Sequence, residues 1–405
     1  MNSAKRVSVS KTRIGILAVS MIGMASLAIT PSYAAIAKFF TLNNTSVQML
    51  TSLPNLFMML AGIIIGKLTA NKVNLKVLTL VSICLVTIAG LLPLMLHTNF
   101  AFLLFCSCLV GLGQGACTNL TQVLIAQLLP QSERESTMGL STTFINIGGM
   151  VFIMGGGQLA ASSSWINNYW IYLFSLLILL IVFLLLPFEN RTVSRNDTKA
   201  GNTKIHLNKF VFYSAFWAFL IMLLNNVLNN NISFFVVREN LGATAQAALT
   251  STISLVGGMI CGLFVGKIGK RLRYSSIALS LCLYGIAYLL IGLFHSLLIV
   301  FIGSFIVGAA MSIAMGQFPY LISLIVDDNS VSMALGIYVA IYSVGGVVSP
   351  LIINPLTSLV SYLGFNVFSL SGLLALMLAV VCLVVKFQKN LVLAVKEVIK
   401  ADNSL

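Results

Sequence analysis

The feature that most constrains this chain is a series of long apolar stretches. They recur from Ile14 to Phe387 with only short polar breaks between them. A helix that crosses a bilayer needs about 20 predominantly apolar residues, because the hydrocarbon core is about 30 Å thick. With 59% hydrophobic and 8% charged residues, the 405-residue chain has more apolar side chain than a soluble core could hide from water. The sequence therefore predicts a membrane protein.

Cutting the sequence at charged and turn residues predicts twelve membrane-spanning helices, and hence an all-α membrane protein. The predicted spans are 14–38, 46–66, 77–96, 100–129, 137–160, 169–187, 210–236, 245–266, 275–294, 297–325, 332–356 and 362–386. The longest polar break follows the sixth span and is predicted to be a linker. The predicted parts are an N-terminal six-helix bundle, a cytoplasmic linker, a C-terminal six-helix bundle and a cytoplasmic tail, at 1–188, 189–209, 210–388 and 389–405.

The basic residues indicate how the chain is oriented. If both termini are cytoplasmic, all 23 Lys and Arg residues except Lys38 and Arg238 fall in cytoplasmic segments. Cytoplasmic segments of membrane proteins carry an excess of Lys and Arg. This rule also explains the net charge of +14 without a nucleic-acid partner. We expect a multi-pass protein of the cell membrane, the inner membrane of a bacterium, surrounded by membrane lipid and with both termini cytoplasmic.

The sequence has no motif of an enzyme or a metalloprotein. Nothing in it resembles a nucleophile triad, a phosphate-binding loop or a cluster of metal ligands. The seven cysteines all fall in apolar segments and are predicted to be small hydrophobic side chains rather than disulfide partners. We therefore expect a protein that is neither an enzyme nor an ATP-driven pump, with no cofactor and no metal.

An internal repeat relates the two halves of the sequence. The fifth predicted span repeats in the eleventh at an offset of 197 residues, where Gly139 and Gly148 return as Gly336 and Gly345. The end of the second span repeats in the eighth at an offset of 200 residues, where Gly62, Gly66 and Lys67 return as Gly262, Gly266 and Lys267. The two halves are therefore predicted to be parallel repeats of one structure.

With these motifs the chain resembles the major facilitator superfamily, whose members have two six-helix bundles around a central cavity and move small solutes by rocking the halves. The segment Gly66-Lys67-Leu68-x7-Lys76 is similar to the family's loop between its second and third spans, and the fifth-span glycines are similar to its antiporter motif. The resemblance covers almost the whole chain and implies a monomeric transporter of a small molecule. Small residues allow helices to slide in close contact. The gating residues that it implies are Gly66, Lys67, Gly148, Gly156, Gly266, Lys267 and Gly345.

The chain departs from the family's pattern at positions that concern gating and coupling. The Asp and Arg positions of the loop motif are Ala70 and Asn71, and Lys270 takes the Asp position in the second half. Phe152 and Ile153 stand where drug-exporting antiporters carry Gly-Pro. These departures put the usual gating charge pair in doubt and weaken the antiporter interpretation.

The nine acidic residues are all predicted to lie outside the spans, in loops, the linker or the tail. Glu133 and Glu135 are assigned to one cytoplasmic loop, and Glu239 to the outer side. Proton-driven carriers commonly use a carboxylate within the membrane. The sequence therefore predicts transport without a carboxylate-based proton relay.

Uncharged polar side chains gather on the first, fourth, seventh and tenth spans, which line the cavity in the family. At 100° per residue, the polar residues Gln114, Thr118, Thr121 and Gln122 of the fourth span share an arc of about 100°. An amide that faces lipid would lack partners, so these faces are predicted to point to substrate or water. Hydrogen bonding between helices is the alternative. The predicted substrate-binding residues are Tyr33, Gln114, Thr118, Gln122, Asn225, Asn226, Asn229, Gln317, Tyr320, Tyr338 and Tyr342.

The two outer cations suggest the charge of the substrate. Lys38 and Arg238 end the first and seventh spans 200 residues apart, so the repeat places them at corresponding outer rims. Two cations at a cavity mouth, with Glu239 as the outer acid, would attract anions. Alternatively, Lys38 extends to the lipid headgroups and Arg238 pairs with Glu239.

These observations together predict a secondary transporter that moves a small organic anion by alternating access, as a uniporter or an exchanger. Two other functions stay open at this point. One is a proton-coupled multidrug exporter of the same fold. The other is a membrane receptor that keeps the fold but does not transport.

Overall fold

The computed structural model describes residues 3–42, 44–70, 73–162, 164–187, 209–241, 244–294, 296–326, 330–390 and 393. In these residues every regular element is helical, and twelve helices are long and apolar enough to cross a membrane. The prediction of an all-α membrane protein with twelve spans is confirmed. The predicted linker and the predicted tail lie almost entirely outside the described residues.

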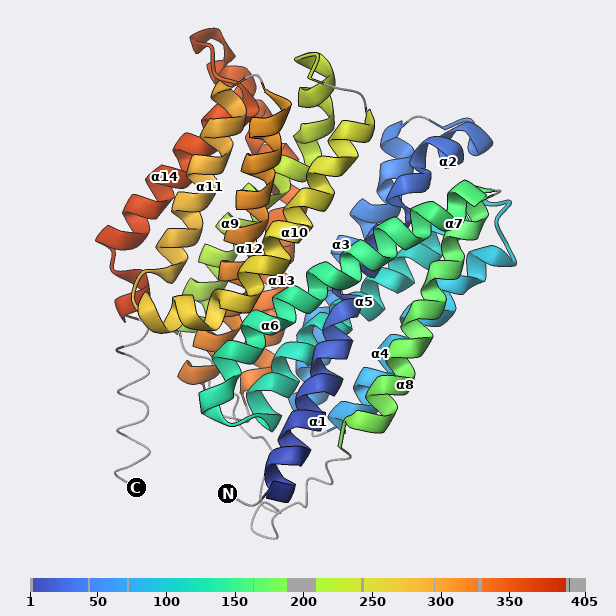
Figure 1. Ribbon diagram of the computed structural model, residues 1–405, viewed down its shortest axis with the longest axis vertical. Coiled ribbons are helices and arrows are strands. Elements are labelled where there is room, and N and C mark those ends of the chain that lie inside the picture. Colours follow the sequence, from blue (N-terminus) through green and yellow to red (C-terminus); the bar gives the residue numbers. More distant parts are fainter. Residues whose placement is uncertain are drawn as a thin grey trace. The chain divides into compact units, whose positions relative to one another are not determined.

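The first half of the sequence supplies six spans, several of them made of more than one helical segment (Figure 1). In order they are α1 (Ser3–Ser20) with η1 (Met21–Ser32) and α2 (Tyr33–Phe40); α3 (Asn44–Ala70); α4 (Leu75–Leu91) with η2 (Leu92–Leu94); α5 (Phe100–Leu128); α6 (Gln131–Met150) with η3 (Val151–Gly155) and α7 (Gly156–Ser162); and η4 (Trp165–Tyr172) with α8 (Leu173–Leu185).

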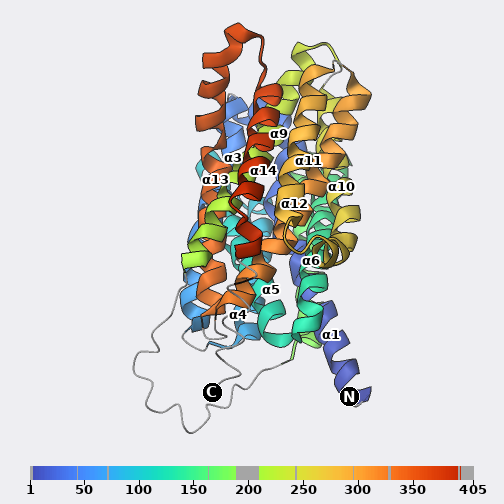
Figure 2. The ribbon, with the colours of Figure 1, turned by 90° about the vertical axis from the view of Figure 1, so that its left-hand side faces the viewer.

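The second half supplies the other six spans, which are mostly single helices. They are α9 (Lys209–Arg238), α10 (Thr244–Arg271), α11 (Ser276–Leu293), α12 (Leu297–Ile325), α13 (Val331–Val360) with η6 (Ser361–Leu363), and α14 (Val367–Val384). Helices α11 and α14 pack along each other, and Figure 2 shows them side by side.

The chain forms two compact units, and their limits differ from those of the two sequence halves. The first unit is made of Met1–Arg134, Gly148–Phe212 and Ile322–Ala340. The second is made of Glu135–Ile147, Tyr213–Leu321 and Ile341–Leu405. Helices α6 and α13 are therefore each divided: residues 135–147 of α6 lie in the second unit and the rest of α6 in the first, whereas α13 lies in the first unit up to Ala340 and in the second from Ile341. The division into bundles at 1–188 and 210–388 stays a prediction.

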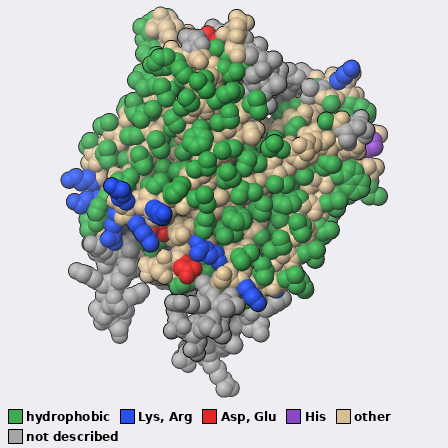
Figure 3. Space-filling view, viewed as in Figure 1, with side chains coloured by type: hydrophobic (Ala, Val, Ile, Leu, Met, Phe, Trp, Pro, Cys, Tyr) green, Lys and Arg blue, Asp and Glu red, His purple; other side chains and the backbone are tan. Residues whose placement is uncertain are grey.

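The outward faces of the helices carry large exposed apolar side chains, which are green in Figure 3. Leu184 on α8 is 76% exposed, and Val384 on α14 is 73% exposed. Such side chains would be costly in water over so large a surface. In a bilayer they face lipid, as the composition requires.

The start of α14 corrects one predicted span. The side chain of Asn366 accepts hydrogen bonds from the backbone N–H groups of Phe368 and Ser369, and the backbone N–H of Asn366 donates to the Ser369 hydroxyl. This reciprocal capping box satisfies N–H groups that a helix start leaves free. The helix therefore begins at Val367, and the predicted start at residue 362 is too early.

The first span is interrupted near its middle. Its central segment η1 is a 3-10 helix in which Met24 has a non-helical backbone (φ −131°, ψ 23°), and Pro31 lies near its end. Such a break leaves backbone groups that need partners from neighbouring helices. Pro319 has a different effect, because α12 continues through it as one helix.

Lys76 connects two spans of the first unit. Its Nζ donates a 2.7 Å hydrogen bond to the backbone carbonyl of Phe183, near the end of α8, and lies 5.2 Å from the centre of the Phe183 ring. A cation at a helix C-terminus interacts favourably with the free carbonyls there. Lys76, predicted to be a loop cation, therefore holds α4 against α8.

Candidate functional site

In the first unit, α3 and the first part of α13 meet at glycines. A Cβ added at Gly62 would lie 2.9 Å from the carbonyl oxygen of Gly336, and one added at Gly336 would collide with the carbonyl of Gly62. At Gly66, one turn further along α3, a Cβ would lie 3.3 Å from the carbonyl oxygen of Ser332. The two backbones are thus in direct contact, as close helix packing through small residues requires.

In the second unit, α10 and the first part of α6 make the contact that the repeat predicts. A Cβ at Gly139 would lie 3.1 Å from the carbonyl oxygen of Gly262 and 2.7 Å from Cβ of Val265. A Cβ at Gly266 would lie 3.0 Å from Cα of Ser136. Gly139 and Gly262 are the repeat partners of Gly336 and Gly62, so one contact occurs twice, once in each unit.

Gly148 and Gly345 form a second pair of equivalent contacts. A Cβ at Gly148 would collide with the carbonyl of Met21 in η1, within the first unit. A Cβ at Gly345 would collide with the carbonyl of Phe219 in α9, within the second unit. Each glycine therefore lets the remainder of a divided helix touch the backbone of the first span of its half.

The other residues given a gating role have different surroundings. A Cβ at Gly156 would lie 2.7 Å from Oδ1 of Asn168 and 3.0 Å from the carbonyl oxygen of Ala28. Lys67 is exposed, and so is Lys267, whose Nζ lies 5.6 Å from the centre of the Phe264 ring.

Gln114 on α5 is bound by protein groups at both ends of its amide. Its Oε1 accepts a 2.7 Å hydrogen bond from the backbone N–H of Ser26 in η1, and its Nε2 donates to Sδ of Met58 at 3.2 Å. The hydroxyl of Thr118 donates to the backbone carbonyl of Gln114. Gln114 therefore supports the interrupted first span, which is the interhelical role left open by the sequence.

We expect Gln114→Leu to lower the stability of the protein by about 1–3 kcal/mol, because the Ser26 N–H would be buried without an acceptor. The measurement is the melting temperature of detergent-purified protein. Thr118→Val is the matched control, since it removes only a hydroxyl bonded within its own helix. A Gln114→Leu melting temperature equal to that of the control would contradict this role.

Next to these residues, α5 holds a group of polar side chains without partners. Asn119 is 0% exposed, and neither its Oδ1 nor its Nδ2 has a hydrogen-bond partner in the described part of the chain. The same is true of Oε1 of Gln122 and the hydroxyl of Thr121. Unpaired buried polar groups are uncommon, and each one calls for an explanation.

Asn119 was missed by the sequence analysis, which selected polar residues by their shared arc on the helix. Asn119 lies outside that arc. The signal that would have identified it is an amide side chain within an apolar helix, because such an amide needs a hydrogen-bond partner whichever way it points.

The remaining predicted residues of the first unit are also buried or bonded. The hydroxyl of Tyr33 forms a hydrogen bond with that of Thr51, joining α2 to α3. Tyr338, on the part of α13 that belongs to the first unit, is 0% exposed. Tyr33 and Tyr338 thus take part in the packing of the unit.

In the second unit, the asparagines of α9 differ in how much hydrogen-bonding capacity they leave free. Oδ1 of Asn225 accepts a 3.0 Å hydrogen bond from the hydroxyl of Tyr284, and Nδ2 of Asn226 donates to the carbonyl of Met222 within the helix. Asn229 is exposed. Tyr342 is buried and Tyr320 is half-buried.

Glu135 corrects the sequence analysis. Helix α6 begins at Gln131, so Glu135 lies in a helix and within the candidate span Gln131–Ala161, and its side chain is only 8% exposed. Nε2 of Gln317 donates a 3.1 Å hydrogen bond to its Oε1. Glu135 is therefore a buried helical residue and not part of a loop, as the sequence analysis had it, and Gln317 is committed to this carboxyl.

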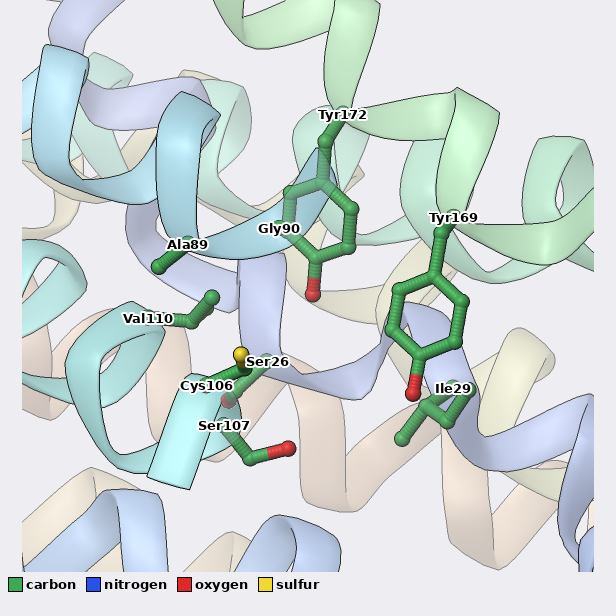
Figure 4. A pocket seen from close by; sticks show the side chains of 9 residues that line it. All are labelled: Ser26, Ile29, Ala89, Gly90, Cys106, Ser107, Val110, Tyr169 and Tyr172. Carbon is green, nitrogen blue, oxygen red and sulfur yellow. The ribbon is translucent and has the colours of Figure 1, made fainter. Parts of the chain in front are cut away.

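A small cavity lies within the first unit and is shown in Figure 4. Tyr169 and Tyr172 of η4 point their hydroxyls toward η1 and α5; Tyr172 donates to the carbonyl of Ala25, whereas the Tyr169 hydroxyl has no partner in the described residues. The cavity has about the size of one water molecule. Substrate pockets are far larger, so in this conformation the cavity has no room for a substrate.

Metal ligands do not cluster in the described residues, where no group of three His, Cys, Asp or Glu side chains is close enough to hold an ion. The seven cysteines are free thiols. Of the two outer cations, Lys38 is exposed in the last turn of α2, while the side chain of Arg238 lies outside the described residues.

The sequence matches the profile of the Major Facilitator Superfamily over residues 15–236 and again over residues 214–397. The chain therefore belongs to the Major Facilitator Superfamily, and it is a multi-pass membrane transporter and not an enzyme. Comparison with curated proteins finds no match.

Solved structures with the same fold include three named transporters. The human organic anion transporter MFSD10 (TETRAN) has a TM-score of 0.74 at 14% identity, over 92% of this chain and 99% of that chain. The proton:xylose symporter XylE, bound to 6-bromo-6-deoxy-D-glucose, has a TM-score of 0.67 at 16% identity, over 93% and 95%. The transporter FucP in the outward conformation has a TM-score of 0.68 at 15% identity, over 93% and 98%. At sequence identities this low, the similarity to these structures shows a shared fold and nothing about the substrate.

Proposed function

We propose that this transporter moves a small organic anion across the membrane by alternating access, as a uniporter or an exchanger. The observation that carries the proposal is the exposed Lys38 at the end of α2, which no described acid pairs with. An unneutralised cation at the entrance to a low-dielectric cavity raises the local concentration of anions. One structural neighbour is an organic anion transporter, which agrees with this substrate class.

The residues that we propose for substrate binding are the polar side chains of α5 and α9 that keep free hydrogen-bonding capacity. In the first unit these are Asn119 and Gln122, and in the second unit they are Asn225 and Asn229. An anion that also carries hydroxyl or amide groups would satisfy such side chains. We also propose that the protein is a monomer in the inner membrane of a bacterium, with both termini in the cytoplasm.

The proposal predicts that Lys38→Ala and Arg238→Ala each lower anion uptake by about threefold at low ionic strength, and much less at high ionic strength, because salt screens exposed charges. Uptake of a carboxylated dye and of a cationic dye of equal size is measured in liposomes that contain only this protein. Lys389→Ala, an exposed cation beyond α14, is the matched control. Preference for the cationic dye, or no change in either variant, would contradict the anion proposal.

A proton-coupled transporter is the second candidate, and Glu135 is the observation that favours it. A buried carboxyl in a membrane span is a functional candidate by default. A pH gradient imposed on the same liposomes separates the two functions, because proton coupling would drive uphill uptake. The absence of any flux, with folded protein, would instead favour a receptor that keeps the fold.

A further inference from the structure

The interruption of the first span is held by side chains from two other segments of the first unit. Just after Met24, the backbone N–H of Ser26 donates a 2.7 Å hydrogen bond to Oε1 of Gln114 on α5. The backbone carbonyl of Ala25 accepts a 3.0 Å hydrogen bond from the hydroxyl of Tyr172 in η4. These two side chains supply partners for backbone groups at the point where the span leaves the regular α-helix.

Tyr169, one turn before Tyr172 in η4, reaches the same place with a hydroxyl that is not paired. The two rings stack, with centres 6.4 Å apart and planes 19° from parallel, and Tyr169 is only 4% exposed. This packing fixes the position of the Tyr169 hydroxyl, which has no hydrogen-bond partner in the described residues. Buried hydroxyls without a partner are uncommon, because leaving water without a new hydrogen bond costs free energy.

The Tyr169 hydroxyl lies among the side chains that line the small cavity of the first unit (Figure 4). Tyr172, Ser26 of η1 and Ser107 of α5 bring three further hydroxyls to the lining. The other lining residues are uncharged and have apolar or sulfur-containing side chains or none: Ile29, Ala89, Gly90, Cys106 and Val110. The cavity therefore offers hydrogen-bond donors and acceptors, and no charge, to whatever occupies it.

Size and chemistry together select the occupant. The cavity has about the volume of one water molecule, and a buried water binds two to four polar groups. No lining residue is acidic, so a cation there would be buried without a counter-charge. A purely apolar cavity of this size would stay dry, but hydroxyls surround this one.

We propose that this cavity is a binding site for one water molecule, which accepts a hydrogen bond from the Tyr169 hydroxyl and donates to the hydroxyl oxygens of Ser26 and Ser107. The water joins η4, η1 and α5 at the interruption of the first span, beside the direct bonds made by Gln114 and Tyr172. The site satisfies Tyr169 but not Asn119, which does not line the cavity.

The melting temperature of Tyr169→Phe tests the site through the direction of its change. With a bound water, the substitution removes one of the hydrogen bonds of that water, and we expect the melting temperature to fall by about 1–3 °C. In a dry cavity the same substitution would remove an unpaired buried hydroxyl, and the melting temperature would rise. Tyr172→Phe is the matched control, because it loses the bond to the Ala25 carbonyl and should lower the melting temperature in both cases.

A second measurement detects the water in the unmodified full-length protein. X-ray irradiation makes hydroxyl radicals from ordered waters, and these radicals oxidise adjacent side chains even where bulk solvent does not reach. Cys106 lines the cavity and is 2% exposed, whereas Cys117 lies on the same helix away from the cavity and is 0% exposed. We expect Cys106 to be oxidised about fivefold faster than Cys117, or more, as followed by mass spectrometry.

Ala89→Val links the oxidation to the cavity, because the added methyl groups would take the space of the water. This variant should lower the oxidation rate of Cys106 to that of Cys117. It should leave unchanged the rate of Cys84, which is half-buried on the same helix as Ala89 and does not line the cavity.

Equal oxidation of Cys106 and Cys117 in the unmodified protein would overturn the proposal, and so would a higher melting temperature of Tyr169→Phe. The oxidation test on the unmodified protein needs no variant to fold. Neither measurement involves transport, so a failure of the proposed function would appear as absent flux, independently of both results.

Discussion

Replacing Asn119 by leucine is expected to raise the melting temperature of this transporter and to reduce its transport rate by tenfold or more. Leucine has nearly the same shape as asparagine and no polar atoms. In the described structure the Asn119 amide is 0% exposed and has no partner for its oxygen or its nitrogen. A buried amide without partners costs about 1–3 kcal/mol in proteins. Leucine removes that cost from this conformation.

The loss of transport follows from the same observation. An unpaired amide is satisfied only when a substrate, water or a second conformation supplies partners, and leucine accepts none of them. Both effects are measured on one preparation, the melting temperature in detergent and the flux in liposomes. Unchanged flux in the Asn119→Leu protein would remove Asn119 from the proposed site.

Asn146→Leu is the matched control for this prediction. Asn146 is buried on α6 like Asn119 on α5, but its Nδ2 donates a 2.7 Å hydrogen bond to the carbonyl of Thr142. The same substitution should therefore leave the melting temperature unchanged or lower it. A rise of equal size at both positions would indicate a general gain from leucine, not relief of an unpaired amide.

The fold of this protein was largely predictable, because a membrane span must be long and apolar, and both properties can be read directly from the sequence. Twelve apolar stretches became twelve spans, and the repeated glycines met at equivalent contacts in the two units. The errors occurred where local chemistry decides. The cap at Asn366 makes α14 begin later in the sequence than predicted. The 3-10 segment η1 interrupts the first span, and the apolar sequence of that span does not reveal the interruption.

The candidate site was less predictable, because helical position does not say which polar side chain already has a partner. Gln114 and Asn119 look alike in sequence, five residues apart on α5. The Gln114 side chain accepts a hydrogen bond from the Ser26 N–H, whereas the Asn119 side chain has no hydrogen-bond partner in the described residues. Glu135 was assigned to a loop because acids mark loops in most membrane proteins. It lies instead in helix α6, buried and hydrogen-bonded to Gln317.

Gly148→Ala and Gly345→Ala are expected to reduce transport by tenfold or more, and by similar factors. A methyl group at either position collides with a backbone carbonyl, of Met21 or of Phe219, and a backbone cannot rotate away as a side chain can. Overpacking of this kind costs about 1–3 kcal/mol. The two sites are repeat partners that lie at, or one turn after, the residue where α6 and α13 continue into another unit, so each change is expected to obstruct the movement of a divided helix.

Gly157→Ala is the control for this last prediction. It lies on the same span as Gly148, but an added Cβ there would be 3.2 Å from a side-chain atom of Pro31, a contact that small shifts relieve. Flux in liposomes is compared for the three variants at equal amounts of folded protein, with melting temperature as the measure of folding. Equal flux in all three would show that close backbone contact at these two glycines does not limit transport. A loss in only one of the repeat partners would show that the two halves move by different means, since their static contacts are the same.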